Sequence, residues 1–481
     1  MSAKSNIFAI AISVLALTIS SCATQGPPSG ASDIEIARYY ADRGDIDAQL
    51  VLGAAYWRGE GVEQDFLQAR HWYKAAAEQD SPEGKYWLGT MLRDGKGGPK
   101  DEAAALSLFT SAGDSGYANA QWSAGHLYLG TEQIEKDQAK AAFWFELAAE
   151  QGILDAQQAI ATFYKHGRGV PLDVQKSTAW WIRAAEQGDA QSQFNVGAAY
   201  RDADGVERDY AEAMKWFLLA AEQNNHKASY AIGTMYRKGQ GVDVDLEVGF
   251  QWYLRAAHGG HELARINVGT LYEKGEGVAR NYEQAAKWLR GPADNGDADA
   301  QFVMGRLYTF GNGVEQSDAI ASEWFLRSAQ TGKRYSQEAI GKNYFQGRGV
   351  PKDTERAIFW LKKAAEQGEG SAAGYLGIVY MTGPPEFRDV EAATSWFEIG
   401  AERGDVVSQV STAMMHSGAV GNRRDPVKFY KWLYIAGERG DPKAQEMLGR
   451  VGASIDPATK DRATQEALEW LSEYRSKPAH E

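Results

Sequence analysis

The chain repeats itself every 36 residues, and this period constrains the fold more than any other feature of the sequence. Steps of 36 residues from Gly53 always reach a small residue, which we call the anchor. The anchors are Gly53, Gly89, Gly125, Ala161, Gly197, Gly233, Gly269, Gly305, Gly341, Gly377, Ala413 and Gly449. A constant period of this size is typical of repeat arrays. The 481 residues therefore predict one array rather than several globular domains.

Helix-capping residues divide each repeat into two predicted helices. Those that mark the start of the second helix stand twelve positions after an anchor, at Asp65, Asp101, Asp137, Asp173, Asp209, Asp245, Asn281, Ser317, Asp353, Asp389 and Asp425. Those that often start the first helix are Asp45, Ser81, Asp189, Asn225, Asp297, Asp405 and Asp441. Between the helices a G-x-G-V turn recurs, as in residues 347–350, and its first glycine suits a left-handed helix end.

Large rings and small residues recur at fixed distances from the anchors and predict the core. Around Gly341 these are Tyr344 and Trp360, together with Ala357 and Ala364, where helices must approach closely. The consensus A-x-x-x-L-G-x-x-Y-x-x-G-x-G-V-x-x-D-x-x-x-A-x-x-W-x-x-x-A-A-x-x-G resembles the Sel-like repeat (SLR) family, which is related to tetratricopeptide repeats. The resemblance runs from about residue 33 to residue 474.

This resemblance implies an all-α fold, a right-handed superhelical α-solenoid of about twelve 36-residue helix-turn-helix repeats. One repeat cannot bury its faces alone, so each must stack on its neighbours. The segment 32–44 is expected to cap the array as a lone second helix, and a helix after Asp456-Pro457 is expected to cap the other end.

The first residues predict a targeting signal. An apolar run from Ile7 to Ile19 is too short to span a bilayer and suits the core of a signal peptide. The sequence Ile19-Ser20-Ser21-Cys22 resembles a bacterial lipobox, which implies lipidation of Cys22, the chain's one cysteine. The predicted organisation is a signal peptide (1–21), a flexible tether (22–32), the SLR solenoid with capping helices (33–475) and a tail (476–481). The alternative is an ordinary cleavage site beside a chance cysteine.

A lipid on Cys22 would hold the chain on a membrane. Ala23, rather than aspartate, follows the cysteine and resembles the outer-membrane sorting preference of Gram-negative lipoproteins. We therefore expect a lipoprotein of the bacterial cell envelope, anchored in the outer membrane and facing the periplasm.

Charge and motif content exclude several function classes. With 51 basic and 64 acidic residues the net charge is −13, which argues against a nucleic-acid partner. The eight histidines lack H-E-x-x-H spacing, and His258 and His261 have no recurring carboxylate or cysteine beside them. The G-x-G turns follow helices and lack a G-K-[ST] ending. We expect no enzyme activity, no catalytic residues, no cofactor and no metal.

The remaining candidate is a binding surface on the first helices, which line the concave face of such solenoids. Positions two before, one after and five after the anchor form one stripe, which in the middle of the array reads Asn195, Thr234, Lys238, Asn267, Thr270, Lys274, Arg306 and Lys342. Asparagine and lysine so placed suit the backbone or a carboxylate of an extended peptide. The alternative is an ordinary solvated helix face. Near the N-terminus Val51, Trp57 and Trp87 predict an apolar patch instead.

These features predict a non-catalytic adaptor lipoprotein that binds an envelope protein or peptide on its concave face. Two alternatives remain open: a surface-exposed or secreted factor that binds a host protein, and an envelope enzyme or factor associated with peptidoglycan or exopolysaccharide. Irregular turns at 130–135, 383–385 and 417–424 are expected to be local drift or to mark bends and partner loops.

Overall fold

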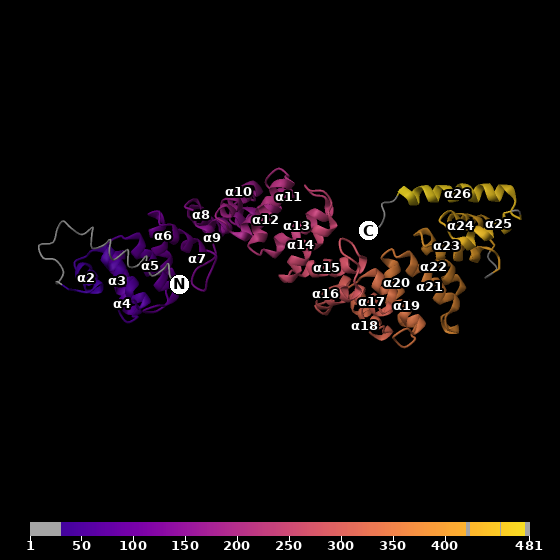
Figure 1. Cartoon of the computed structure of the whole chain (residues 1–481), viewed down its shortest axis with the longest axis horizontal. Coiled ribbons are helices and arrows are strands. Elements are labelled where there is room, and N and C mark those ends of the chain that lie inside the picture. Colours follow the sequence, from indigo (N-terminus) through magenta and orange to yellow (C-terminus); the bar gives the residue numbers. More distant parts are fainter. Residues whose placement is uncertain (1–29, 420–423, 453, 477–481) are drawn as a thin grey trace. The chain divides into compact units, whose positions relative to one another are not determined.

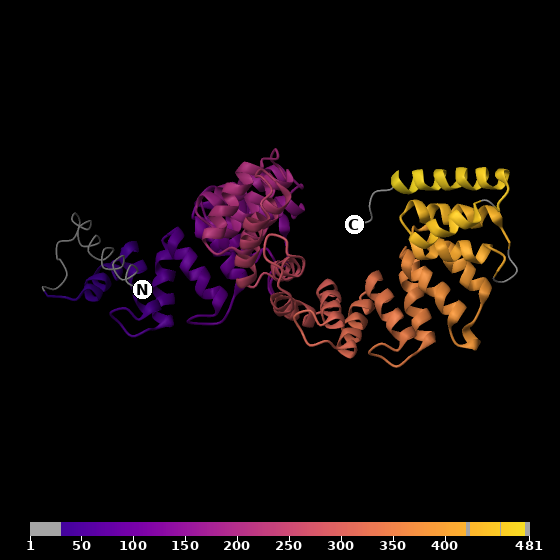
Figure 2. The same cartoon turned by 45° about the vertical axis from the view of Figure 1, so that its right-hand side comes forward.

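A computed structural model describes residues 30–419, 424–452 and 454–476 (Figures 1 and 2). Cys22, the predicted signal peptide and most of the predicted tether lie outside these residues. The described segments are α-helical, apart from turns, a 3-10 helix η1 (Pro385–Phe387) and an isolated antiparallel bridge between Ser417 and Arg424.

The helices fall into two compact units, divided within α13 (His226–Lys238). The first unit runs to Ile232 and includes Gln240–Asp243. Its helices are α2 (Asp33–Ala41), α3 (Ile46–Arg58), α4 (Phe66–Glu78), α5 (Pro82–Asp94), α6 (Glu102–Asp114), α7 (Ala118–Leu127), α8 (Gln138–Glu150), α9 (Leu154–His166), α10 (Val174–Glu186), α11 (Ala190–Asp202) and α12 (Tyr210–Glu222).

The second unit takes in Gly233–Gly239 and the chain from Val244 onward. Its helices are α14 (Leu246–His258), α15 (Glu262–Lys274), α16 (Tyr282–Asp294), α17 (Ala298–Phe310), α18 (Asp318–Gln330), α19 (Arg334–Gln346), α20 (Thr354–Glu366), α21 (Gly370–Thr382), α22 (Val390–Glu402), α23 (Val406–His416), α24 (Pro426–Glu438), α25 (Pro442–Val451) and α26 (Pro457–Ser476).

Each repeat is a pair of helices, the first odd-numbered and the second even-numbered. Within each unit a helix packs on the next one along the chain, for example α17 on α18, α18 on α19 and α19 on α20. The predicted all-α array of helix pairs is confirmed, whereas the right-handed superhelix stays a prediction.

The predicted capping residues all cap their helices. In α20, for instance, Asp353 Oδ1 accepts a hydrogen bond of 2.9 Å from the Arg356 amide, and at the first helix α17 Asp297 Oδ1 accepts one of 2.8 Å from the Ala300 amide. The same contact recurs at every second-helix cap and at the other predicted first-helix caps. These short polar side chains satisfy amides that the helices leave unpaired, so they set the helix boundaries.

The anchor glycines mark where the two helices of a repeat cross. A Cβ atom built on Gly305 would lie 2.5 Å from a ring carbon of Phe325, twenty residues further on. The same overlap occurs between Gly89 and Phe109, and between Gly341 and Leu361. At these three anchors a ring or a leucine therefore fills the space next to the glycine, and a larger residue has no room.

The second glycine of each G-x-G-V turn joins neighbouring repeats. Gly349 has a φ of 71°, and a Cβ there would overlap the backbone of Asp318, the first residue of the preceding repeat's second helix. Equivalent close approaches occur at Gly169, Gly277 and Gly313. The turn glycine thus allows backbone-to-backbone packing between repeats.

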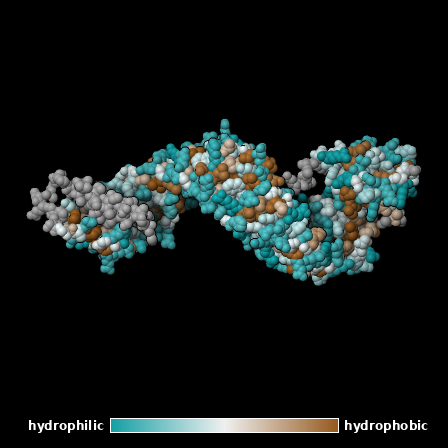
Figure 3. Space-filling view, viewed as in Figure 1, coloured by the Kyte–Doolittle hydropathy of each residue, from teal (hydrophilic) through white to brown (hydrophobic). Residues whose placement is uncertain are grey.

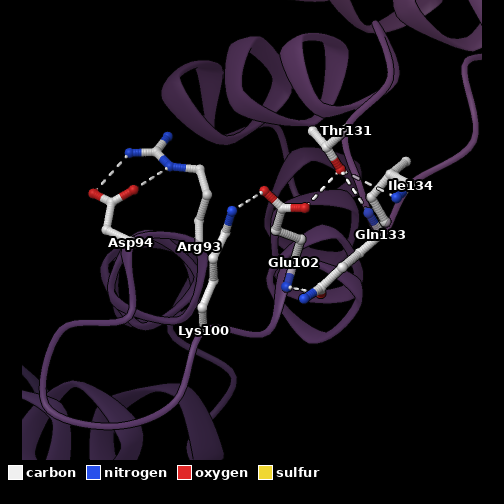
Figure 4. A network of polar contacts seen from close by, with 7 residues as sticks. All are labelled: Arg93, Asp94, Lys100, Glu102, Thr131, Gln133 and Ile134. Carbon is white, nitrogen blue, oxygen red and sulfur yellow. Dashed lines mark hydrogen bonds and ion pairs between the residues drawn. The ribbon is translucent and has the colours of Figure 1, made fainter.

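The irregular turn at 130–135 replaces this glycine contact with hydrogen bonds (Figure 4). Gln133 stands at the position of the second glycine, and its Oε1 atom accepts a 2.8 Å bond from the Glu102 amide. Thr131 Oγ1 donates to the Glu102 carboxylate at 2.6 Å, and Lys100 Nζ lies 2.9 Å from it. Glu102 is only 4% exposed. This turn therefore holds the start of α6 with side chains instead of a close backbone approach.

The first and last described helices are α2 and α26. At the start, α2 begins with a capping box between Ser32 and Glu35. At the end, α26 packs against α24 (Figures 1 and 2). Trp470 on α26 packs edge-on against Trp432, and its indole N–H donates a 2.9 Å bond to Glu402. The C-terminal cap therefore reaches back beyond its nearest repeat.

Candidate functional site

The second unit carries a groove across its first helices, which we call the α17–α21 groove. It has a volume of about 450 Å³. On α17 its lining follows helical spacing at Phe302, Arg306 and Phe310, because residues four apart share one helix face. The α19 lining continues it at Tyr335, Glu338, Ala339, Lys342, Asn343 and Gln346, and Tyr375 on α21 completes it. The groove therefore spans three consecutive repeats.

Aromatic rings give the groove an apolar wall. Phe302 and Tyr335 have ring centroids 4.4 Å apart, and Phe325 lies 5.7 Å beyond Phe302. Burial and the nearby Asp299 carboxylate, which accepts a hydrogen bond from the Tyr335 hydroxyl, raise the pKa of Tyr335 to about 12. Phe310 is 64% exposed at the rim. On the face seen in Figure 3 hydrophilic residues predominate and hydrophobic ones form separate patches.

The cations of the groove are held by carboxylates. Lys342 pairs with Glu338 on its own helix, and its ammonium group lies 4.0 Å from the centre of the Tyr375 ring. Arg306 lies 3.3 Å from Glu273 on α15. A third cation at the groove, Arg348, lies 2.9 Å from Asp318. These ion pairs leave the groove close to electrically neutral.

Asn343 is a buried polar residue of the groove and is 9% exposed. Its Nδ2 atom donates a 2.9 Å bond to Ser322 Oγ, which in turn donates a 2.8 Å bond to the Arg348 carbonyl. These bonds fix the orientation of the amide. Across residues 30–419, 424–452 and 454–476, no hydrogen-bond donor to the Oδ1 atom of Asn343 is found.

The other predicted stripe residues do not line this groove. Thr234 shares a 3.0 Å hydrogen bond with Tyr253, and Lys274 lies 4.0 Å from Glu276. Lys238 is exposed, while Asn267 and Thr270 are half-buried. Asn195 belongs to the first unit, where it accepts a 3.0 Å bond from Gln191. Of the predicted set, only Arg306 and Lys342 line the groove.

The residues of the apolar patch expected near the N-terminus belong to an aromatic cluster that packs against the core of the first unit. Trp57 lies 6.5 Å from Trp87 and 5.3 Å from Phe66, measured between ring centroids. Trp87 also stacks on Tyr73 at 5.8 Å. Val51 packs against the same core.

The described segments contain no cluster of candidate metal ligands and no helix that could span a membrane. Within them, no group of three or more histidine, cysteine or acidic side chains is arranged to hold a metal ion. His261, considered above with His258, caps α15 by accepting a 3.2 Å bond from the Ala264 amide. No described helix is both long and apolar enough to cross a bilayer.

Reasoning from the stripe missed Asn343 and the aromatic wall. One signal was present: the residue two after the anchor is polar only at Asn343, while the other repeats carry Ala55, Met91, Leu127, Phe163, Ala199, Met235, Leu271, Leu307, Val379, Met415 and Val451. The approach of Phe302 to Tyr335 depends on how neighbouring repeats stack, so the spacing within one repeat does not reveal it.

Comparisons with known proteins agree with the observed helix pairs. The Sel1 repeat model matches residues 46–81, 82–117, 118–153, 154–189, 190–225, 226–261, 263–297, 298–332, 334–369 and 370–405. These ten segments correspond to α3–α22, and the helices α23–α26 follow them outside the matched segments. A search of curated proteins gave no match.

The solved structures that are similar to this chain include two repeat proteins. One is a protective antigen present in uropathogenic Escherichia coli strains that displays an SLR fold, with 29% identity, a TM-score of 0.80, and 92% of this chain and 95% of that chain covered. The other is a Sel1 repeat protein from Oxalobacter formigenes, with 27% identity, a TM-score of 0.43, and 77% and 99% covered. The chain therefore belongs to the Sel1 repeat family and is an all-α scaffold of helix-pair repeats.

Proposed function

We propose that the protein is a non-catalytic adaptor lipoprotein of the bacterial cell envelope that binds a partner protein or peptide in the α17–α21 groove. The observation that carries the proposal is the groove itself, with an aromatic wall beside the buried amide of Asn343. Repeat scaffolds bind partners along extended surfaces built from successive repeats, and this groove spans three of them. Pockets that fix a ligand combine apolar walls with a few placed polar groups.

Photocrosslinking in living cells tests the partner. A photoreactive residue at Lys342 is expected to crosslink one specific envelope protein, and Asn195 and Asn267 report on the rest of the predicted stripe. The controls are Phe359, which is 50% exposed, and Lys363, both on the exposed side of the second helix α20. Crosslinks from Lys342 no stronger than those from the controls would rule out the groove as the binding site.

The membrane anchor rests on residues 19–22, and we propose that Cys22 carries the lipid. Each buried acyl methylene would contribute about 0.8 kcal/mol to membrane binding. An alkyne fatty acid fed to cells is expected to label the natural chain and not Cys22→Ala. A chain secreted with a cleavable non-lipoprotein signal, and starting at Ala23, should appear in the soluble periplasmic fraction. Membrane association of that unlipidated chain would contradict the anchor, and its localisation would need another explanation.

A second candidate function is a surface-exposed or secreted factor that binds a host protein. It is favoured by the similarity to the protective antigen, which extends over 92% of this chain. Protease treatment of intact cells separates the two candidates. Digestion of the chain while a periplasmic marker stays intact would support surface exposure, and protection until the outer membrane is opened would support the periplasmic adaptor.

A further inference from the structure

We infer that the α17–α21 groove binds an extended, uncharged peptide segment, which packs an apolar side chain against Phe302 and Tyr335 and donates one backbone N–H to Asn343 Oδ1. The inference rests on the proposed binding function and names the chemistry of the occupant. It differs from the reading of the sequence, in which lysine and arginine select the ligand by charge.

The ion pairs of the groove argue against an acidic occupant. An acidic ligand that took over the ion pair of Lys342 or Arg306 would displace Glu338 or Glu273, whose side chains are only 12% and 10% exposed. The displaced carboxylate would then remain partly buried without its cation, which is costly. A basic ligand would in turn meet Lys342, Arg306 and Arg348. An uncharged segment disturbs none of these pairs.

Asn343 supplies the polar part of the recognition. Asn343 places an amide in the groove at a position that is apolar in the other repeats. Its Nδ2 atom has a partner in Ser322, and the Oδ1 acceptor remains. Because Ser322 is itself held by the Arg348 carbonyl, the acceptor is oriented before any ligand arrives. An uncharged extended peptide offers a suitable donor in every backbone N–H outside proline.

The apolar wall supplies the rest of the contact. Phe302 and Tyr335 present rings 4.4 Å apart, and Phe310 extends the wall at the rim. The hydroxyl of Tyr335 already donates to Asp299, so its ring, rather than its polar end, is available to a ligand. An aromatic or branched side chain next to the bonded N–H would bury its area against these rings.

Peptide selection tests the inference on the full chain. Phage-displayed random linear peptides are selected on the natural chain and counter-selected on Ala339→Trp, in which the indole fills the groove. Peptides rich in apolar residues and poor in aspartate and glutamate are expected. Their binding should change little with added salt. Acidic, salt-sensitive peptides that lose binding in Lys342→Gln would overturn the inference.

A matched pair of changes then tests the hydrogen bond. Asn343→Leu is expected to fold, because Leu271 and Leu307 occupy the same position in other repeats, and circular dichroism verifies this. Methylating one backbone nitrogen of a selected peptide should weaken its binding to the natural chain about tenfold, which is about 1.4 kcal/mol. The same methylation should cause no further loss with Asn343→Leu, since coupled groups are not additive. Methyl effects of equal size in both chains at every nitrogen would refute the bond to Asn343.

The outcomes distinguish this inference from the proposed function. A cellular crosslink at Lys342 together with acidic, salt-sensitive peptides leaves the adaptor in place and refutes the uncharged occupant. A selection that yields no peptide sensitive to Ala339→Trp refutes the uncharged occupant as well. If the crosslink is also missing, both proposals fail.

Discussion

At an anchor glycine such as Gly305, a single added carbon atom would disturb the packing of the repeat. We expect Gly305→Ala to destabilise α17 and α18 by about 1–3 kcal/mol, because its methyl group would overlap the ring of Phe325. Gly449→Ala is the matched control, since a Cβ there meets nothing within 4 Å, and it should stabilise α25 by about 0.5–1 kcal/mol. Hydrogen exchange of the amides in these helices measures both effects. Equal effects at the two anchors would contradict the packing role.

Individual residues also show how far the sequence alone could predict this molecule. The capping residues were predictable, because a short polar side chain before a helix acts through its own next residues, as Asp353 does. The contact of Gly349 with Asp318 was not, because it joins residues of different repeats. For the same reason the stripe pattern found Arg306 but not Glu273, its carboxylate partner in the preceding repeat.

The turn between the two helices of a repeat also packs against the preceding repeat. We expect Gly349→Ala to be more destabilising than Gly347→Ala, although both glycines have positive φ values, 71° and 72°. Each alanine is strained by the backbone conformation, at about 1–2 kcal/mol. Only the alanine at 349 also overlaps the Asp318 backbone, whereas at 347 the nearest contact is a Lys352 side-chain atom at 3.3 Å. Urea denaturation measures the free energy of unfolding of both variants. A larger loss of stability for Gly347→Ala would show that Gly349 and the Asp318 backbone are packed less tightly than described.

The irregular turn at 130–135 should make the start of α6 sensitive to acid. Hydrogen bonds from Thr131 and Lys100 lower the pKa of Glu102 below its usual value. The stabilisation from ionised Glu102 is therefore complete above the usual carboxyl pKa of about 4.3, and it is lost as pH falls through the lower folded value.

Glu102→Gln tests this turn, because it should reduce both the stability of α6 at neutral pH and the loss of stability on acidification. Hydrogen exchange of the α6 amides, corrected for the intrinsic effect of pH, makes the measurement. Glu132→Gln is the control, since Glu132 is exposed in the same turn. An unchanged acid response in Glu102→Gln would exclude Glu102 as its source.

A destabilising substitution should lower the stability of its own repeat and of the adjacent ones only, because each repeat contacts mainly its neighbours. Trp470→Ala removes a ring that is 9% exposed and packs on Trp432 and Tyr474. We expect about 3 kcal/mol of destabilisation at this end. Amides of α22, α24 and α26 should exchange faster, since Glu402 also loses its bond to the indole, while those of α3–α6 should not change. Faster exchange throughout the chain would show that it unfolds as one unit.

At the scale of the whole chain, the period in the sequence predicted the all-α array, and the family match confirmed it. The period carries little information on binding partners, because the residues that define a repeat, such as Gly341 and Ala357, are buried between the helices. The groove is lined by residues of three repeats that depart from the repeat pattern, above all Asn343. Binding specificity is therefore expected where the repeats differ, and stability where they agree.

The most direct test of the groove as the binding site is the affinity of the crosslinked partner for Ala339→Trp. Ala339 lines the groove, and Ala458→Trp places the same indole at an exposed site on α26 of the same unit. We expect Ala339→Trp to weaken binding at least about tenfold, or about 1.4 kcal/mol, with an unchanged circular dichroism spectrum, and Ala458→Trp to bind like the natural chain. Equal affinity of the partner for both variants would contradict binding in the α17–α21 groove.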